Sequence, residues 1–325
     1  MIQSFLLGAL GIIFALFGHF SVCVGSERVE QKSTISSPFR FETLSGTSLG
    51  LWEGNRPVFV YNYGGIASPS APDVPKHSAY LHPIYGLDGE VLTDDFPKDH
   101  VYHRGLYWAW SHIKVNGREY DSWSLRGIRS QFQRWLRQEE KTNVAIVGVE
   151  NGWFVGEKQI MREQVFIEAH VASAENRSID IALTWTPIDQ PVTLSGAPGK
   201  SYGGLTFRFA PRTETIITVP SGRTREDLLL TKLPWADFSA DFKKPGQFSG
   251  AAILVNPTHP DYPPTWMTRH YGMLAVGWPG VTPQTFPSGM SFGCRYRIWV
   301  HRGAPTPSEI QKAYESYRMA SKTNG

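Results

Sequence analysis

Short stretches in which apolar residues alternate with polar or small ones recur along most of the chain. Ile179, Ile181, Leu183 and Trp185 are separated by single residues of that kind, and a period of two is typical of a strand with one buried face. The same alternation predicts strands around Leu205, Phe207 and Phe209 and around Tyr296, Ile298 and Val300. Further apolar runs predict strands at Val58–Tyr63, Ala79–Tyr85, Val144–Val149, Gln164–Val171, Ile216–Val219 and Ala251–Val255.

Two local signals fix a turn and a helix. Asn116-Gly117 follows a short apolar run and is a strong two-residue hairpin signal. Near the C-terminus, Thr306, Pro307 and Glu309 supply a cap, a proline at the first helical position and a glutamate at the third. The residues that follow on one helical face are apolar or aromatic, namely Ile310, Ala313, Tyr314 and Tyr317. We therefore expect a helix that packs on a sheet.

The order of the elements predicts the fold class. Strands do not alternate with helices, which disfavours a parallel sheet. We predict an all-β protein, a large antiparallel β-sandwich with a C-terminal helix, formed by a single domain over residues 26–325. A two-lobed sandwich divided near residue 200 is the alternative. The proline-rich segments Ser68–Pro75 and Asn256–Pro264 are predicted surface loops because proline interrupts a central strand.

The N-terminus predicts the compartment. Ile2–Val24 is almost entirely apolar and carries no Lys, Arg, Asp or Glu, and it ends in small residues before Ser26. We interpret residues 1–25 as a signal peptide and expect the protein to be secreted or periplasmic. The segment is also long enough to span a bilayer, so a retained membrane anchor is the alternative.

Composition narrows the partners. The 325 residues are 41% hydrophobic and 13% aromatic, which is enough apolar material for a large core. The net charge is +3 and no run of Lys or Arg occurs, which argues against a nucleic-acid partner. The only cysteines are Cys23 and Cys294, which excludes a disulfide framework or a cysteine-built zinc site.

Potential chemistry is densest between Tyr80 and His112. This stretch contains His82, His100, His103 and His112 together with several carboxylates and Arg104. Histidine moves protons near neutral pH, and an adjacent arginine holds a carboxylate or stabilises an oxyanion. His103 and Arg104 are therefore the leading catalytic candidates, although chance clustering of polar residues in a loop is the alternative.

Strand geometry qualifies this choice. In an extended segment His103 and Arg104 point to opposite faces. They share a pocket only at the start of a strand or at a bulge, and Gly105 favours such a distortion. Trp108 and Trp110 share a face, and they belong either to the core or to a platform on which a substrate stacks.

Other residues complete the predicted pocket. Asp237 lies among aromatic residues, where burial would raise its pKa and suit it to acid catalysis, although a surface position is the alternative. Arg269 and His270 follow a proline-rich loop, and His270 is a candidate second proton carrier or a structural histidine. We assign proton relay or orientation to His82, Asp95 and His270. Substrate binding is assigned to His100, Trp108, Trp110, Asp237 and Arg269.

Two further kinds of site, a metal site and a serine nucleophile, are suggested by short motifs. His100 and His103 with His82 or a carboxylate could form a two-histidine, one-carboxylate metal site, but the spacing is not a specific signature, and we assign no metal and no cofactor. Gly289-Met290-Ser291-Phe292-Gly293 matches the nucleophile-elbow pattern. A predicted strand follows it, and no acid lies between Ser291 and the last histidine, so the required order is not met.

The sequence resembles a secreted bacterial family. The blocks that carry the resemblance are His82-Pro83-x-Tyr85-Gly86-x-Asp88-Gly89, the segment from Asp94 to Trp110 around His103-Arg104-Gly105, and Tyr202-Gly203-Gly204-Leu205. They are similar to the family labelled "methane oxygenase PmoA", over roughly residues 40–303. The resemblance implies a secreted protein of bacteria that degrade polysaccharides. Methane oxidation in a membrane needs several spanning helices, which this chain lacks outside its single N-terminal apolar segment, so we set that activity aside.

A sandwich of this size is similar to the galactose-mutarotase-like supersandwich, whose members act on sugars. We therefore predict a secreted carbohydrate-active enzyme that uses His/Arg acid-base chemistry on a sugar or uronide, as a lyase, hydrolase or epimerase. The alternatives are a glycan-binding module without catalysis and a metal-dependent oxygenase or hydrolase. The expected partner is a carbohydrate or another small molecule, and a membrane only if the N-terminal segment is retained.

Overall fold

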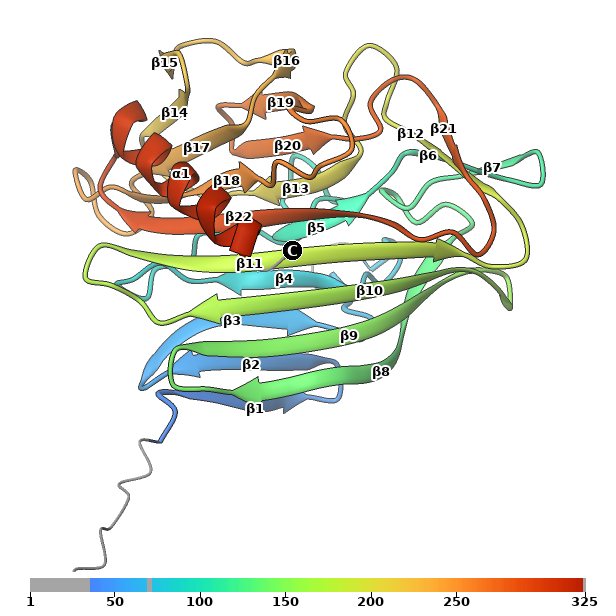
Figure 1. The fold of residues 1–325 in the computed structure, drawn as a ribbon, viewed down its shortest axis with the longest axis horizontal. Helices are drawn as coiled ribbons and strands as arrows, with labels where there is room; N and C mark the ends of the chain where they lie inside the picture. Colours follow the sequence, from blue (N-terminus) through green and yellow to red (C-terminus); the bar gives the residue numbers. More distant parts are fainter. Residues whose placement is uncertain (1–35, 69–71, 324–325) are drawn as a thin grey trace, which may run out of the picture. The chain divides into compact units, whose positions relative to one another are not determined.

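Two nine-stranded antiparallel sheets dominate the computed structural model, which describes residues 36–68 and 72–323 (Figure 1). The first sheet has the spatial order β1 (Phe39–Ser45), β2 (Ser48–Glu53), β3 (Arg56–Asn62), β4 (Tyr80–Ile84), β5 (Leu106–Ala109), β13 (Gly204–Arg208), β20 (Met273–Gly277), β19 (Thr265–Arg269), β16 (Leu229–Lys232). The second has the order β15 (Gly222–Thr224), β14 (Thr215–Val219), β17 (Trp235–Ala240), β18 (Ser249–Val255), β22 (Phe292–Arg302), β11 (Asn176–Pro187), β10 (Lys158–His170), β9 (Val144–Val155), β8 (Arg129–Glu140).

A small third sheet joins segments that lie far apart in the sequence. Its order is β21 (Gln284–Phe286), β12 (Val192–Ser195), β6 (His112–Val115), β7 (Arg118–Tyr120). The β6–β7 hairpin turns at Asn116 and Gly117, whose φ angles are 49° and 73°. Positive φ at both central residues is the geometry that an Asn-Gly turn provides, so the predicted hairpin is confirmed.

The two large sheets pack face to face around one hydrophobic core. Leu51 and Leu81 enter it from the first sheet, and Val165 and Ile181 enter it from the second. The predicted all-β antiparallel sandwich is confirmed. In the first sheet β5 pairs with β13, and in the second β11 pairs with β22. Strands from both sides of residue 200 therefore share each of the two large sheets. The described residues lie in one compact unit that begins at Ser36, so the predicted signal peptide lies outside them.

A single buried carboxylate links the two sheets inside the core. Glu163 of β10 accepts indole N–H bonds on Oε2 from Trp108, Trp153 and Trp185, at 2.9, 3.0 and 2.8 Å. Its Oε1 accepts a bond of 2.9 Å from Asn151, whose amide also donates to Tyr61 of β3. Burial raises the pKa of Glu163, and the four hydrogen bonds oppose that effect.

The C-terminal helix packs on the outer face of the second sheet. This helix, α1 (Pro307–Thr323), begins after Thr306, whose hydroxyl and backbone N–H both donate to Glu309 Oε2 at 2.8 Å. Ile310, Tyr314 and Tyr317 pack against Trp235 and Leu254. The capped amphipathic helix predicted from the sequence is confirmed.

Strand β8 forms one edge of the second sheet and pairs only with β9. The register of this pair shifts twice, between Phe132 and Arg134 and between Trp135 and Arg137. At the end of β8, the side chain of Glu140 accepts a 2.7 Å bond from the backbone N–H of Phe41 in β1, which is an edge strand of the first sheet. Each of these edges therefore carries an irregularity or a side-chain contact where another strand would pair.

The Glu163 junction gives a prediction for stability. Glu163→Leu leaves three buried indole N–H groups without an acceptor, each costing about 1–3 kcal/mol. We expect the free energy of unfolding to fall by at least about 3 kcal/mol in chemical denaturation. Glu163→Gln keeps an acceptor oxygen and should lose less. An unchanged denaturation midpoint for Glu163→Leu would show that the junction does not stabilise the fold.

Candidate functional site

The His103–Arg104 segment lies on the outer face of the first sheet, opposite the core. Along β4 and β5, Leu81 and Leu106 enter the core, whereas Tyr80 and Tyr107 belong to a separate cluster on the other face. The turn from Pro97 to Arg104 precedes β5. We call the residues gathered here the outer cluster: His77, Tyr80, His82, Asp95, Asp99, His100, His103, Arg104, Tyr107, Trp123, Arg208 and Tyr271.

Gly105 explains how His103 and Arg104 enter the same cluster. A Cβ atom at this position would lie 2.2 Å from the carbonyl oxygen of Leu81, so only glycine permits this close approach of the two backbones. Strand β5 begins at Leu106. His103 and Arg104 therefore precede the strand, and its alternation does not separate them, which is the arrangement that the sequence required for a shared pocket.

Arg104 is completely buried. Its Nη1 donates to the carbonyl oxygens of Val101 and His103 at 2.9 and 2.6 Å, and the ring of Phe96 covers the guanidinium at 3.4 Å. Its Nε and Nη2 have no hydrogen-bond partner among the described residues. Two N–H-bearing atoms of a fixed buried cation thus remain for another group.

Asp95 faces this guanidinium without bonding to it. Its Oδ1 lies 3.7 Å from Arg104 Nε and has no hydrogen-bond partner among the described residues, while its Oδ2 accepts a 2.9 Å bond from the Tyr80 hydroxyl. Burial raises the pKa of Asp95 to about 6, against the opposing effects of Arg104 and Tyr80. Asp95 is therefore a carboxyl group that exchanges a proton near neutral pH.

His82 and His103 are neutral at that pH. Burial lowers the pKa of His103 to about 3, and the electrostatic effects of the neighbouring His100 and Arg208 act in the same direction. Burial and Arg104 lower the pKa of His82 to about 4, and its Nδ1 lies 3.0 Å from the Thr93 hydroxyl. The Nδ1 of His103 has no hydrogen-bond partner among the described residues. These rings therefore offer hydrogen bonds in the neutral form.

Aromatic rings surround His103. It stacks on His100 with ring centroids 4.5 Å apart and meets Trp123 edge-on at 5.5 Å. His100 in turn stacks on Tyr271 at 5.0 Å. Because His100 and His103 are nearly parallel, at 13°, their nitrogen lone pairs lie in separate planes and do not converge on one ion.

Seven members of the outer cluster were not among the site residues predicted from the sequence, namely His77, Tyr80, Asp99, Tyr107, Trp123, Arg208 and Tyr271. Tyr107 is buried, and its hydroxyl has no partner in the described part of the chain. Arg208 of β13 bonds through Nη2 to both oxygens of Asp99, at 2.7 and 2.8 Å, and lies 4.8 Å from the ring of Tyr271. An arginine at the end of an otherwise apolar strand was the available signal for Arg208.

Trp108 and Trp110 lie in the core instead of the outer cluster. Trp108 donates to Glu163, and Trp110, which is fully buried, donates to the Trp278 carbonyl oxygen at 2.6 Å. The sequence left two interpretations for this pair, a core position or a stacking platform for a substrate, and the observed positions match the core.

His270 and Arg269 border the cluster at the β19–β20 turn. His270 Nδ1 lies 2.8 Å from Asp227, and its Nε2 lies 3.2 Å from the Thr224 carbonyl oxygen. With both ring nitrogens engaged, His270 is placed as a structural residue, while its neighbour Tyr271 enters the cluster. Arg269 bonds to the Thr268 carbonyl oxygen and lies 3.9 Å from Asp227.

Asp237 lies in the second sheet, on β17, and is not brought to the outer cluster. It is fully buried, bonds to His301 Nε2 at 2.7 Å and accepts a 2.8 Å bond from Ser239. Its carboxylate is thus satisfied within its own sheet, by Ser239 of the same strand and by His301 of β22, two strands away.

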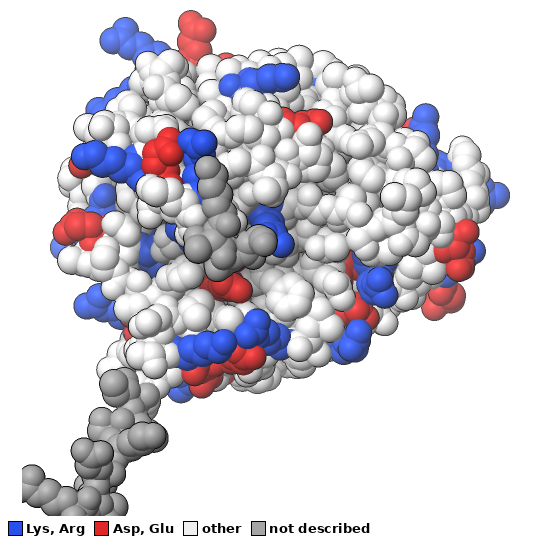
Figure 2. All heavy atoms as spheres, viewed as in Figure 1, with Lys and Arg blue, Asp and Glu red and all other residues white. Residues whose placement is uncertain are grey.

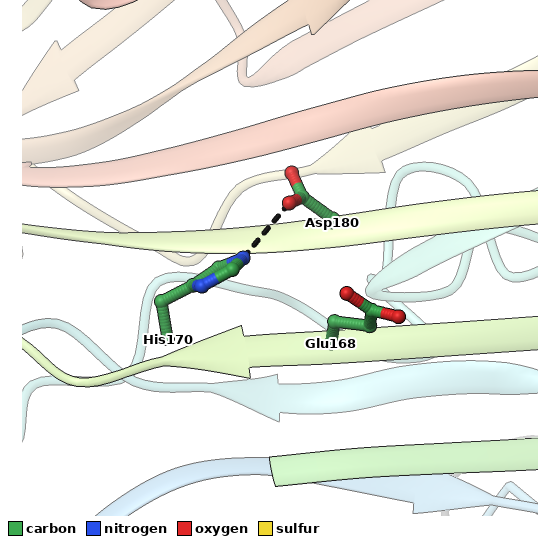
Figure 3. Close-up of side chains that lie close together, drawn as sticks. All are labelled: Glu168, His170 and Asp180. Atoms are coloured by element: carbon green, nitrogen blue, oxygen red, sulfur yellow. Dashed lines mark hydrogen bonds and ion pairs between the residues drawn. The ribbon is translucent and has the colours of Figure 1, made fainter. Parts of the chain in front are cut away.

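A second group of ionisable side chains lies on β10 and β11. Among the described residues, only Glu168, His170 and Asp180 bring three potential metal-ligand atoms within 4.8 Å of one another (Figure 3). Asp180 already accepts two bonds from Arg297, at 2.6 and 2.7 Å, in addition to the 2.8 Å contact with His170. The arginine neutralises the carboxylate, so the arrangement is that of an ion-pair network.

A groove of about 620 Å³ lies near the β16 edge of the first sheet. Leu230, Tyr262 and Val281 are exposed beside Lys232 and Asp261, and several prolines form its walls. None of the predicted site residues lines it.

Charge is mixed on the face shown in Figure 2, where positive and negative side chains are interspersed. No helix in the described part of the chain is long and apolar enough to cross a membrane.

The fold and the outer cluster define an antiparallel β-sandwich protein with a carboxyl, imidazole and guanidinium site on the outer face of one sheet. The chain belongs to a family of unknown function, DUF6807, whose sequence profile matches residues 49–315. Membership of this family does not assign an activity. The resemblance to the secreted family labelled "methane oxygenase PmoA" stays a prediction. No curated protein matches the chain.

Solved structures of sugar-related proteins are among the structural neighbours. A GalM/aldose epimerase homologue from C. elegans is 10% identical, with 82% of this chain and 100% of that chain covered and a TM-score of 0.35. A galactose mutarotase related enzyme from Lactobacillus acidophilus is 9% identical, with 82% and 97% covered and a TM-score of 0.33. These low identities and TM-scores give no information about the outer cluster.

The raised pKa of Asp95 gives a prediction for stability. The difference between about 6 and the ordinary 3.8 corresponds to about 3 kcal/mol by which folding favours the protonated form. Asp95→Asn should therefore stabilise the protein at pH 7.5, by up to that amount, in denaturant unfolding. The gain should disappear as the pH falls from about 6 to below 3.8, where Asp95 is protonated in both states.

Asp99→Asn is the matched control, because the pKa of Asp99 is shifted in the opposite direction and the expected change in stability has the opposite sign. Hydrogen bonds from Arg208 and His100 outweigh burial and hold the pKa of Asp99 at about 2, so its ionised form stabilises the fold. This variant should be less stable than the wild type at pH 7.5. A destabilised Asp95→Asn would show that Asp95 has a structural role.

Proposed function

We propose that the protein is a carbohydrate-active enzyme that transfers a proton at the outer cluster. The observation that carries the proposal is the approach of Asp95 Oδ1 to Arg104 Nε at 3.7 Å without a hydrogen bond, where both atoms have no hydrogen-bond partner in the described part of the chain. A structural ion pair would close this distance. A substrate hydroxyl between them would donate to the carboxylate and accept from the guanidinium.

Asp95 is the proposed general base. Its Oδ1 takes the proton from the sugar, and the negative charge that develops on the substrate oxygen faces Nη2 of Arg104. Neutral His82 and His103 orient the substrate by hydrogen bonds, and Tyr80 holds Asp95 in place. The roles first predicted for His103 and Asp95 are thus exchanged, because His103 has a pKa of about 3 and Asp95 one of about 6.

Polar and aromatic groups lie together in this cluster, as in sugar-binding sites. Tyr107, Trp123 and Tyr271 supply apolar ring surface, and each tyrosine also carries a hydroxyl. We also propose that the enzyme is a lyase, a hydrolase or an epimerase. A further part of the proposal is that residues 1–25 are removed and that the protein is secreted or periplasmic. The mass of the mature protein recovered from the expression host tests the cleavage and should correspond to a chain that begins at Ser26.

Product detection by mass spectrometry tests the activity. The purified protein is incubated with neutral, uronate and keto-sugar oligosaccharides. Cleavage with gain of water would indicate a hydrolase, and cleavage without it a lyase. Epimerisation leaves the mass unchanged and is followed by proton NMR with solvent deuterium exchange.

Asp95→Asn should lower turnover by at least about 100-fold, the usual contribution of a general base. The control is Asp88→Asn, which removes a carboxylate paired with Arg302 away from the outer cluster and should keep full turnover. In the wild type, kcat/KM should rise with pH through about 6 and then level off, because Asp95 must be ionised. Full turnover by Asp95→Asn would refute the proposal, and sugar binding without turnover would support the glycan-binding alternative.

A further inference from the structure

We propose that the substrate carries a carboxylate, as a uronic acid does, and that Arg208 binds this carboxylate in place of Asp99. The inference rests on the proposed function and names the substrate class of the same site. Asp99 is then the counter-ion of Arg208 in the unliganded protein.

Arg208 has unused hydrogen-bonding capacity. It is 4% exposed, and among the described residues the only hydrogen bonds of its side chain join Nη2 to the two oxygens of Asp99. Its Nε and Nη1 are buried and have no partner among the described residues. Unpaired buried donors are costly, and a guanidinium that retains them is suited to a ligand with several acceptor atoms.

The position of Asp99 allows its side chain to move away from Arg208. It belongs to the turn between Pro97 and Arg104, its side chain is 47% exposed, and its other contact is His100 at 3.0 Å. Asp180 and Arg297 make a contrast, because they belong to adjacent strands β11 and β22 and their side chains are only 25% and 13% exposed. A turn residue can move from its partner without breaking a sheet, whereas Asp180 cannot.

The contact between Arg208 and Asp99 indicates which kind of ligand group Arg208 binds. Both oxygens of a carboxylate already lie at 2.7 and 2.8 Å from Nη2. A neutral hydroxyl in the same place would leave a buried charge uncompensated, which is strongly unfavourable. A substrate carboxylate restores the charge balance. His100 and Tyr271, 43% and 38% exposed, border the position from the solvent side.

The test is a comparison of affinities by isothermal titration calorimetry at pH 7.5. The probes are D-glucuronate and D-galacturonate, with D-glucose and D-galactose as their neutral counterparts. Asp99→Asn removes the competing charge while keeping the size of the side chain, so both uronates should bind roughly tenfold more tightly than to the wild type. Asp88→Asn removes a carboxylate from an arginine elsewhere and should change nothing.

Arg208→Lys completes the comparison. A lysine keeps the charge but not the planar donors, so uronate affinity should fall roughly tenfold while the neutral sugars are unaffected. The inference is overturned if Asp99→Asn binds neither uronate more tightly than the wild type, which includes the absence of binding to both. Neutral sugars bound as well as the uronates would also overturn it and leave the proposed function standing. Uronate binding that strengthens in Asp99→Asn, without turnover of any oligosaccharide, would support the inference and refute catalysis.

Discussion

The convergence of three indole N–H groups on one oxygen of Glu163 fixes how the two sheets pack. A buried carboxylate without a cation is tolerated only when hydrogen bonds replace water, and here Trp108, Trp153, Trp185 and Asn151 supply four of them. Trp108 comes from the first sheet and the other donors from the second. A shift of one sheet relative to the other would break several of these bonds at once, so apolar packing alone does not set the alignment.

This constraint reaches the outer cluster through β5. Trp108 points into the core and bonds to Glu163, while the preceding residue, Tyr107, points to the opposite face. Immediately before the strand, Gly105 brings the chain against β4, and Arg104 lies beneath Phe96. Buried groups therefore hold Tyr107 on the sheet and Arg104 just before it, whereas Asp99 and His100 lie in an exposed part of the preceding turn. The site thus combines a fixed cationic part with a more exposed carboxylate.

Local sequence patterns predicted the parts of this molecule that depend on neighbouring residues. The alternation around Ile181, the Asn116-Gly117 turn and the Thr306 cap each depend on a few adjacent side chains. His82, Asp95, His103 and Arg104 were found together because one short segment carries them. Arg208 and Tyr271 come from β13 and the β19–β20 turn, and the three indoles that bond to Glu163 come from three other strands. Only strand order and register unite these groups, and a periodicity of two does not specify either.

The outer strands bear on the behaviour of the protein at high concentration. An open sheet edge offers unpaired backbone groups to any other chain, and β8 is twelve residues long. Its two register shifts interrupt the regular spacing that an incoming strand needs, and Glu140 already occupies the outward N–H of Phe41 on the neighbouring edge. Removing these irregularities would leave the fold's interior unchanged and would favour the assembly of copies edge to edge.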